Sequence, residues 1–322
     1  MKYIELTKSL SKLDNIYLIS GEDHYLCYDA LEKIKNAINL SMPDMNSVYL
    51  ETNDFEEVAN ACNIFPFIDA KRLVVVTNFC PNASSKTQKE MFEKYLSSPM
   101  QTTILVFFNT EDDSFFKNYK TKLTYVDCSK LDSNSICNYI LKYFEKNNVV
   151  CTQKLAAMID LYCLSDMQRI HGEIEKIVSY FGESGELTEE IVDNLVTKDK
   201  EYQIYSLTEY ISRGDALRAI DLVDVLGRKG SMNILASLYS SFRRLFYVAV
   251  TPKSEMELAK ELGVKEFAVK MMKMQIKNFT PKKLKQIVDY LMDIDSNIKK
   301  GKIKEEITAK LAVTELLKIR NA

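Results

Sequence analysis

The sequence predicts an α/β domain built on a parallel sheet, followed by a chain that is helical to its end. Up to about residue 130, short apolar runs rich in β-branched and aromatic residues alternate with amphipathic stretches, which is typical of a parallel sheet covered by helices. After about residue 130 these runs stop and helical periodicity takes over. Because 322 residues exceed one ordinary domain, we expect two or three domains.

Five apolar runs in the front part are predicted to be buried strands. They are Ile16–Ile19, Val48–Leu50, Leu73–Val76, Ile104–Phe108 and Leu123–Val126. Between the runs, apolar residues recur at helical spacing, for example Cys27, Leu31, Ile34 and Ile38. Each strand is therefore expected to be joined to the next by a covering helix.

We expect three packed units, at residues 1–130, 131–200 and 201–322. The middle unit is predicted to hold three or four short helices and no strands, and the polar stretch at 197–201 follows it. In the rear unit, residues 234–249 place their apolar side chains on one stripe, as in a helix of a bundle. Ser254 with Glu257 forms a capping-box pattern, and Thr280 with Pro281 predicts another helix start.

Composition restricts the class of protein. Hydrophobic residues make up 46% and charged residues 27% of the chain, without an apolar run long enough to span a membrane. Seven cysteines with no C-x-x-C spacing and only two histidines indicate neither a disulfide framework nor a zinc site. The opening residues lack a secretory signal. We therefore expect a soluble cytoplasmic protein without metal or cofactor.

Charge is distributed unevenly along the chain. Residues 1–100 carry 10 Lys+Arg and 14 Asp+Glu, whereas residues 251–322 carry 16 and 10. Ordinary solvated helix faces are one interpretation of the basic rear; an acidic partner or nucleic acid is the other.

The first strand runs into the turn where nucleotide-binding α/β domains hold phosphate. Such a turn uses glycines, bare backbone N–H groups and a lysine. Here it is Ser20-Gly21-Glu22-Asp23-His24-Tyr25, with two carboxylates where a triphosphate would lie. The sequence therefore predicts that this turn does not support ATP hydrolysis.

Glu111-Asp112-Asp113 is the nearest candidate for a magnesium-binding pair at a strand end. The run is interpreted as a loop and helix cap, because Asp readily caps a following helix.

The segment from Asp54 to Arg72 is the least ordinary part of the front domain. Asp54 opens a helix, after which Phe55, Val58, Cys62 and Phe65 fall at core spacing. Pro66 is predicted to disrupt that helix and to leave Phe67 and Ile68 off the buried stripe. Two large apolar residues at an exposed helix end indicate a contact site for a partner, the alternative being packing under the sheet.

Leu258 to Val264 followed by a basic helix has the pattern of a helix-turn-helix. Its second helix would have to offer Lys265, Glu266 and Phe267 to base edges, and glutamate and phenylalanine are poor readers of a major groove. Packing inside a bundle is the favoured interpretation.

In order along the chain, these segments resemble the delta subunit family of the bacterial DNA polymerase III clamp loader. The matching segments are 16–23, 65–68 with 71–76, 173–177, 234–235 with 242–245, 258–264, and Leu291, Asp295, Ile298, Lys299 and Gly301. The resemblance implies an ATPase-like (AAA+ type) front domain without a P-loop, a small helical lid domain, and an all-α collar domain that oligomerises.

The resemblance also implies a function and its partners. A delta subunit binds the ring-shaped sliding clamp, the beta subunit, through a hydrophobic pair and helps to open the ring for loading on primed DNA. Its implied neighbours are the gamma or tau subunits, which bind ATP, and delta prime, with primer–template DNA met as part of the complex. The chain would then belong to the DNA polymerase III holoenzyme, a DNA-directed DNA polymerase and hence a transferase complex.

By position ahead of Lys71, the resemblance implies that Phe67 and Ile68 are the clamp-binding pair, with Pro66 and Phe65 beside them. It stays open whether the main clamp contact, a hydrophobic wedge, is made by Phe65 or by Phe67 and Ile68. Cys128-Ser129-Lys130 stands where relatives that donate an arginine finger carry Ser-Arg-Cys. The implied subunit is therefore not an enzyme by itself.

Two other functions remain as alternatives. A helix-turn-helix regulator would require sequence-dependent affinity for duplex DNA, whereas a clamp-loader subunit would show salt-sensitive DNA binding at most. A degenerate nucleotide-binding NTPase would require ATP binding by the isolated chain.

Overall fold

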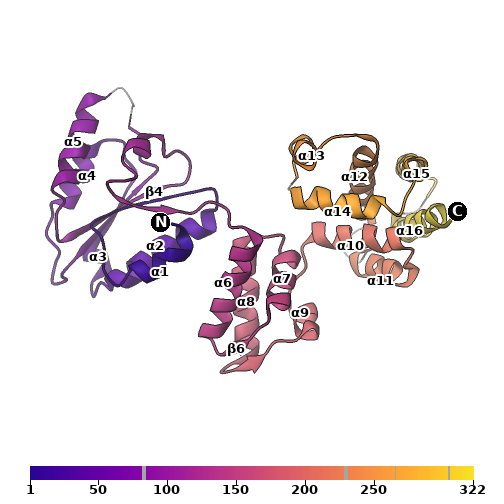
Figure 1. The fold of residues 1–322 in the computed structure, drawn as a ribbon, viewed down its shortest axis with the longest axis horizontal. Helices are drawn as coiled ribbons and strands as arrows, with labels where there is room; N and C mark the ends of the chain where they lie inside the picture. Colours follow the sequence, from indigo (N-terminus) through magenta and orange to yellow (C-terminus); the bar gives the residue numbers. More distant parts are fainter. Residues whose placement is uncertain (82–84, 228–230, 265, 304) are drawn as a thin grey trace. The chain divides into compact units, whose positions relative to one another are not determined.

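A computed structural model of the chain describes residues 1–81, 85–227, 231–264, 266–303 and 305–322 (Figure 1). The chain divides into two compact units, residues 1–160 with 165–196 and residues 161–164 with 197–322. Each unit has its own buried core.

The first unit begins with a five-stranded sheet that confirms the predicted strands. Its strands are β1 (Ile16–Ser20), β2 (Ser47–Leu50), β3 (Arg72–Thr77), β4 (Thr103–Asn109) and β5 (Thr124–Asp127). They lie in the order β2-β3-β4-β1-β5, and every neighbouring pair is parallel. The central strands are buried on both faces, which explains why their sequences are continuous apolar runs.

Helices cover both faces of the sheet (Figure 1). Helices α4 (Phe55–Cys62) and α5 (Lys86–Ser97), with the 3-10 helix η1 (Ser114–Asn118), bury a core rich in phenylalanine on one face. Helices α1 (Tyr3–Ser9) and α2 (His24–Ile38) pack on the other face. Helix α1 is not predicted by the sequence.

Because all five strands are parallel, their amino ends lie along one side of the sheet and their carboxyl ends along the opposite side; we call these the amino edge and the carboxyl edge. The loops that follow β1, β4 and β5 meet at the carboxyl edge. Helix α3 (Pro43–Asn46), which runs directly into β2, and the loop between α4 and β3 lie at the amino edge. These two edges hold the two candidate sites.

The rest of the first unit is mainly helical. It contains α6 (Ser133–Lys146), most of α7 (Gln153–Tyr162), α8 (Met167–Phe181) and α9 (Glu189–Leu195). The expectation that this region has no strand is wrong, because β6 (Val149–Val150) and β7 (Gly185–Glu186) form a small parallel pair. Two-residue strands are too short to show a periodic pattern.

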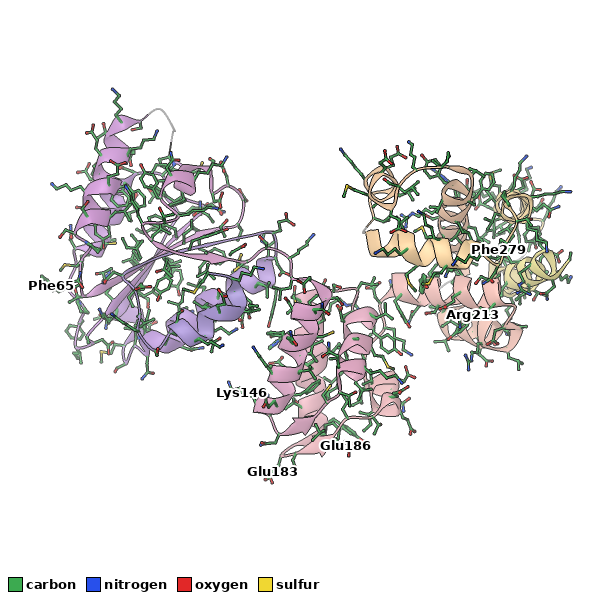
Figure 2. All side chains as sticks on the ribbon, viewed as in Figure 1. Phe65, Lys146, Glu183, Glu186, Arg213 and Phe279 are labelled. Carbon is green, nitrogen blue, oxygen red and sulfur yellow. The ribbon has the colours of Figure 1, made fainter. Side chains whose placement is uncertain are left out.

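The second unit is a helical bundle, as predicted. Its helices are α10 (Lys200–Arg213), α11 (Ala216–Gly227), α12 (Ser231–Val250), α13 (Glu255–Leu262), α14 (Glu266–Ile276), α15 (Pro281–Lys299) and α16 (Glu305–Asn321). Leu235, Leu238, Phe242 and Leu245 of the predicted α12 stripe are buried, and the rest of the stripe is partly buried. The rings of Phe242 and Phe279 meet edge to face with their centroids 6.0 Å apart (Figure 2 labels Phe279). The predicted caps at Ser254 and Thr280 are confirmed.

Among the helices described, none combines the length and apolar character needed to cross a membrane.

Candidate functional site

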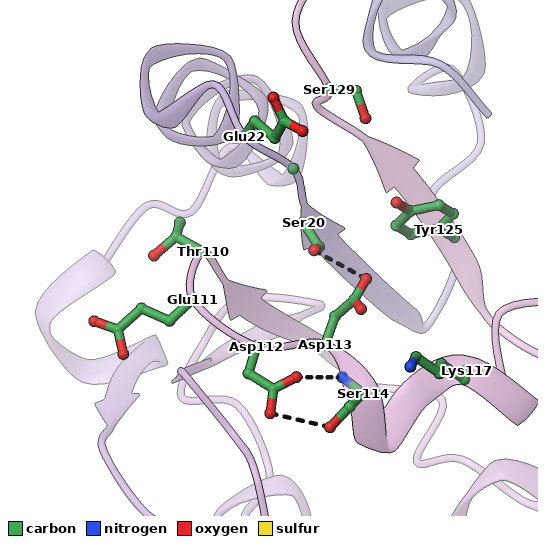
Figure 3. Close-up of a pocket in the computed structure, with 11 residues that line it drawn as sticks. Ser20, Glu22, Thr110, Glu111, Asp112, Asp113, Ser114, Lys117, Tyr125 and Ser129 are labelled. Atoms are coloured by element: carbon green, nitrogen blue, oxygen red, sulfur yellow. Dashed lines mark hydrogen bonds between the residues drawn. The ribbon is translucent and has the colours of Figure 1, made fainter. Parts of the chain in front are cut away.

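A polar pocket of about 370 Å³ lies at the carboxyl edge of the sheet, where open α/β sheets ordinarily bind their ligands (Figure 3). It is lined by Ser20, Gly21, Glu22, Thr110, Glu111, Asp112, Asp113, Ser114, Lys117, Tyr125 and Ser129. The lining contains four carboxylates and one lysine, a balance that opposes a polyphosphate.

Two backbone N–H groups at the turn after β1 are bonded within the chain. The Asp23 N–H donates to the Cys128 carbonyl at 3.1 Å, and the Leu26 N–H donates to the Asp23 carboxylate at 3.1 Å. The latter bond caps α2. Amides that are occupied in this way are not free to hold phosphate oxygens.

Gly21 has a packing reason to be glycine. A Cβ at this position would lie 2.1 Å from the carbonyl carbon of Cys128, in the backbone that follows β5. No side chain fits such an approach. The one glycine that matches a phosphate loop is thus required by contact between the β1–α2 turn and the end of β5.

The acidic run after β4 is a loop, as predicted. The Asp112 carboxylate accepts bonds from the Ser114 N–H at 2.8 Å and from its hydroxyl at 3.0 Å (Figure 3). Asp113 pairs with Lys120 at 2.6 Å and accepts a bond from the Ser20 hydroxyl at 3.1 Å. In the described ranges, no group of three or more His, Cys, Asp or Glu side chains is arranged to hold a metal ion.

The loop between α4 and β3, at the amino edge, has the opposite character. Large apolar side chains are exposed there: Ile64 by 52%, Phe65 by 71%, Phe67 by 51% and Ile68 by 74%. Phe65, labelled in Figure 2, lies at the outer margin of the sheet domain. We name residues 64–68 the apolar loop; it contains all the residues predicted as a partner site, with Pro66 half-buried among them.

The structure corrects the expected course of this segment. Helix α4 ends at Cys62, so that Phe65 does not continue the buried stripe of Phe55, Val58 and Cys62. Phe67 and Ile68 therefore stand in a loop, five and six residues beyond the end of the helix expected to carry them. The predicted exposure of this pair is confirmed.

The side chain of Asn46, the last residue of α3, makes hydrogen bonds to the backbone of the apolar loop. Its side-chain amide donates to the Phe67 carbonyl at 2.8 Å, and its side-chain oxygen accepts from the Phe67 N–H at 2.6 Å. Asn46 is fully buried. No sequence pattern selects Asn46, because the residue that it bonds, Phe67, lies 21 residues further along the chain.

Asp69 completes the support. Its carboxylate accepts bonds from the N–H groups of Ser41 at 3.0 Å and Met42 at 3.1 Å, and from the Asn46 amide at 2.7 Å. The bond from Ser41, together with those from Met42 and Asn46, lowers the pKa of Asp69 although partial desolvation opposes the shift. The carboxylate is thus held ionised next to the loop.

Ile68 adopts an unfavourable backbone conformation at the tip. Its φ is 67°, and the Asp69 N–H donates to the Phe67 carbonyl at 2.8 Å across it. This is a γ-turn with a positive central φ, which is rare and strained, above all for a β-branched residue. Such strain persists only where neighbouring contacts determine the conformation.

The helix-turn-helix pattern in the rear unit packs into the bundle. Leu258 and Ala259 of α13 and Val269 of α14 share a buried cluster with Val248 of α12. Lys265 and the side chains of Glu266 and Phe267, which would have to read DNA, lie outside the described residues.

Family models, curated sequences and a solved structure all match this chain to the delta subunit of DNA polymerase III. A family model for the DNA polymerase III delta subunit matches residues 17–129, and a model for the C-terminal domain of that subunit matches residues 201–316. DNA polymerase III subunit delta of Bacillus subtilis is 24% identical, covering 98% of this chain and 96% of its own length. The probable delta subunit of Mycoplasma genitalium is also 24% identical, covering 88% and 93%.

A solved structure has the same fold. The DNA clamp loader delta protein of Bacillus subtilis superimposes with a TM-score of 0.72 at 22% identity, covering 98% of this chain and 99% of that protein. The α/β sheet domain and the helical rear, each matched by its own family model, together show that the chain belongs to the DNA polymerase III delta subunit family.

Proposed function

We propose that this chain is a non-catalytic clamp-loader subunit that binds the sliding clamp through the apolar loop and helps to open the ring for loading on primed DNA. One observation carries the proposal. Four large apolar side chains, each more than half exposed, stand within residues 64–68 on a loop whose backbone is held by buried Asn46. Aromatic and aliphatic anchors of this kind dominate protein interfaces.

Binding leads to opening only through a difference in affinity. If the apolar loop fits a pocket that is better formed in the opened ring, binding shifts the ring toward that state by the difference in binding free energy. In this proposal Phe67 and Ile68 make the main contact with the clamp pocket, and Phe65 adds apolar contact area beside them. ATP would act in neighbouring subunits and would expose or hide the loop.

The partners follow from the family. The helical unit after residue 200 would form a collar with the ATP-binding gamma or tau subunits and with delta prime, and primer–template DNA would be met within that complex. Under this proposal residues 1–130, 131–200 and 201–322 are the ATPase-like, lid and collar domains, and the chain works in the cytoplasm. Membership of the polymerase complex gives the chain no chemistry of its own.

The proposal is tested by titrating the isolated chain with the sliding clamp of the same cell. A Phe67→Ala, Ile68→Ala double variant should lose about 100-fold or more in affinity, as truncation of a hot-spot pair does. The matched control is Val150→Ala with Tyr180→Ala, which removes two other side chains that are each 62% exposed. Only the loop variant should lose affinity.

Ring opening needs a separate measurement. A clamp assembled on closed circular DNA can leave it only through an opened interface, so release of the clamp reports opening directly. Wild-type chain should accelerate release and the loop variant should not. Absence of clamp binding by the wild-type chain would overturn the proposal and favour the DNA-binding alternative.

A further inference from the structure

The apolar loop depends on a residue that would not itself touch a partner. Asn46 is 0% exposed, yet its side chain bonds both the N–H and the C=O of Phe67 and donates a third bond to the Asp69 carboxylate. A side chain that satisfies the N–H and the C=O of one residue fixes where that residue lies and which way its peptide groups face.

Asp69 extends this support to the backbone ahead of α3. Through the N–H groups of Ser41 and Met42 it ties the end of the loop to the segment that leads into Asn46. The residue before Ile68, Phe67, and the residue after it, Asp69, are therefore both held by hydrogen bonds.

The hydrogen bonds made by Asn46 and Asp69 stabilise the strained backbone conformation at Ile68. Left to itself, an exposed loop would relax away from a positive φ at a β-branched residue. The bonds made by Asn46 and Asp69 oppose that relaxation, so the chain retains the turn without any partner present.

We propose that Asn46, acting through Phe67 and Asp69, is a positioning residue that keeps the apolar loop in its clamp-binding conformation in the free chain. This inference rests on the proposed function. If the loop visits other conformations, the apparent affinity falls in proportion to the fraction that remains competent. Clamp affinity then depends on a buried residue outside the contact surface.

Asn109 offers an unusually close control. It is 1% exposed, its side-chain amide donates to the carbonyls of Phe79 at 2.8 Å and Asp112 at 2.7 Å, and its oxygen accepts from the Phe79 N–H at 3.2 Å. Like Asn46, it bonds both the N–H and the C=O of one phenylalanine, but that phenylalanine is buried and follows β3 at the carboxyl edge, away from the apolar loop. Asn46→Ala and Asn109→Ala each remove two bonds to a phenylalanine backbone. The third bond lost goes to the Asp69 carboxylate in the first variant and to the Asp112 carbonyl in the second.

The experiment measures clamp affinity and unfolding for both variants in the full chain. Asn46→Ala should weaken clamp binding by about tenfold or more, given the usual cost of leaving buried partners unbonded. Asn109→Ala should lose similar stability and keep wild-type affinity. Amide hydrogen exchange across residues 64–70 should accelerate in Asn46→Ala alone.

A double variant separates positioning from general damage. In a chain that already carries Phe67→Ala and Ile68→Ala, Asn46→Ala should weaken clamp binding no further, because the side chains that it positions are gone. If Asn46→Ala prevents folding, Asp69→Ala removes the second half of the support without opening a buried site, and the same loss of affinity is expected.

The outcomes for this inference and for the proposed function differ. If wild type binds the clamp, the loop variant does not, and both Asn46→Ala and Asp69→Ala bind like wild type, the positioning role is wrong and the function stands. If Asn46→Ala and Asn109→Ala lose affinity equally, the effect is one of stability and the inference is overturned. If wild type fails to bind, the proposed function itself fails.

Discussion

At the carboxyl edge of the sheet, internal hydrogen bonds tie polar groups such as Asp23 and Asp112 to the chain, whereas at the amino edge internal bonds hold apolar side chains in solvent. Ligands of open α/β sheets ordinarily bind at the carboxyl edge. Here that edge is occupied by the N-cap of α2 at Asp23, the contact of Gly21 with Cys128 and the Asp113–Lys120 pair. The amino edge instead presents Phe67 and Ile68 above a fully buried asparagine.

The comparison shows that the two ends of one sheet can carry surfaces of opposite character, one polar and one apolar. At the carboxyl edge, the turn after β1 packs against the backbone that follows β5. The exposed surface on the opposite edge then becomes the part that can act on another protein.

The largest expected effect concerns the carboxyl edge. Gly21→Ala should lower the free energy of unfolding by about 3 kcal/mol, because the new Cβ meets backbone that has no room to move. Gly172→Ala is the matched control, since a Cβ there meets nothing within 4 Å. It lies inside α8 and should be neutral or stabilising. Urea unfolding compares them, and equal stability of the two variants would contradict a packing role for Gly21.

A smaller effect of opposite sign is expected at the amino edge. Ile68→Gly should raise the free energy of unfolding by about 1 kcal/mol, because glycine accepts the positive φ without strain. The same variant should bind the clamp less tightly, since the anchoring side chain is lost. Ile68→Ala loses the side chain too but keeps a Cβ, so it should be less stable than Ile68→Gly. Equal stability of the Gly and Ala variants would show that the turn is not strained.

The support by Asp69 should depend on pH. Its pKa is lowered in the folded chain, first by the bond from Ser41, so its contribution is complete above the ordinary pKa of an aspartate and is lost as pH falls through the lower folded value. Asp69→Asn should therefore lower the thermal midpoint at pH 7. The difference from wild type should shrink below about pH 4. A difference that stays constant from pH 7 to pH 3 would mean that the carboxylate charge has no part in the support.

At the carboxyl edge, we expect magnesium and ATP to have no effect on thermal stability. Magnesium and ATP together should leave the thermal midpoint unchanged, because a ligand that does not bind the folded state cannot stabilise it. A saturable rise in the midpoint would revive the nucleotide-binding alternative and show that the carboxylates of this pocket tolerate phosphate.

The sheet could be predicted because burial on both faces leaves a direct mark on the sequence. Runs such as Leu73–Val76 and Ile104–Phe108 are apolar at every position, and all of those residues are buried. Helix starts at Ser254 and Thr280 were equally readable, because a cap is made by residues a few positions apart.

The candidate site could be predicted only in part. The exposure of Phe67 and Ile68 followed from Pro66, but Phe65 was wrongly assigned to the buried stripe because periodicity does not reveal that α4 ends at Cys62. Asn46 could not be found, since its bonds reach Phe67 and Asp69 across 21 and 23 residues and no local pattern encodes such contacts.

Clamp binding measured for one variant from each edge tests the central claim most directly. The amino-edge variant is Phe67→Ala with Ile68→Ala, and the carboxyl-edge variant is Glu22→Gln with Glu111→Gln, two exposed carboxylates that line the pocket. We expect the first to lose about 100-fold or more in affinity and the second to remain within about twofold of wild type. Loss of binding in the carboxyl-edge variant, with the amino-edge variant unaffected, would contradict the assignment of the working surface.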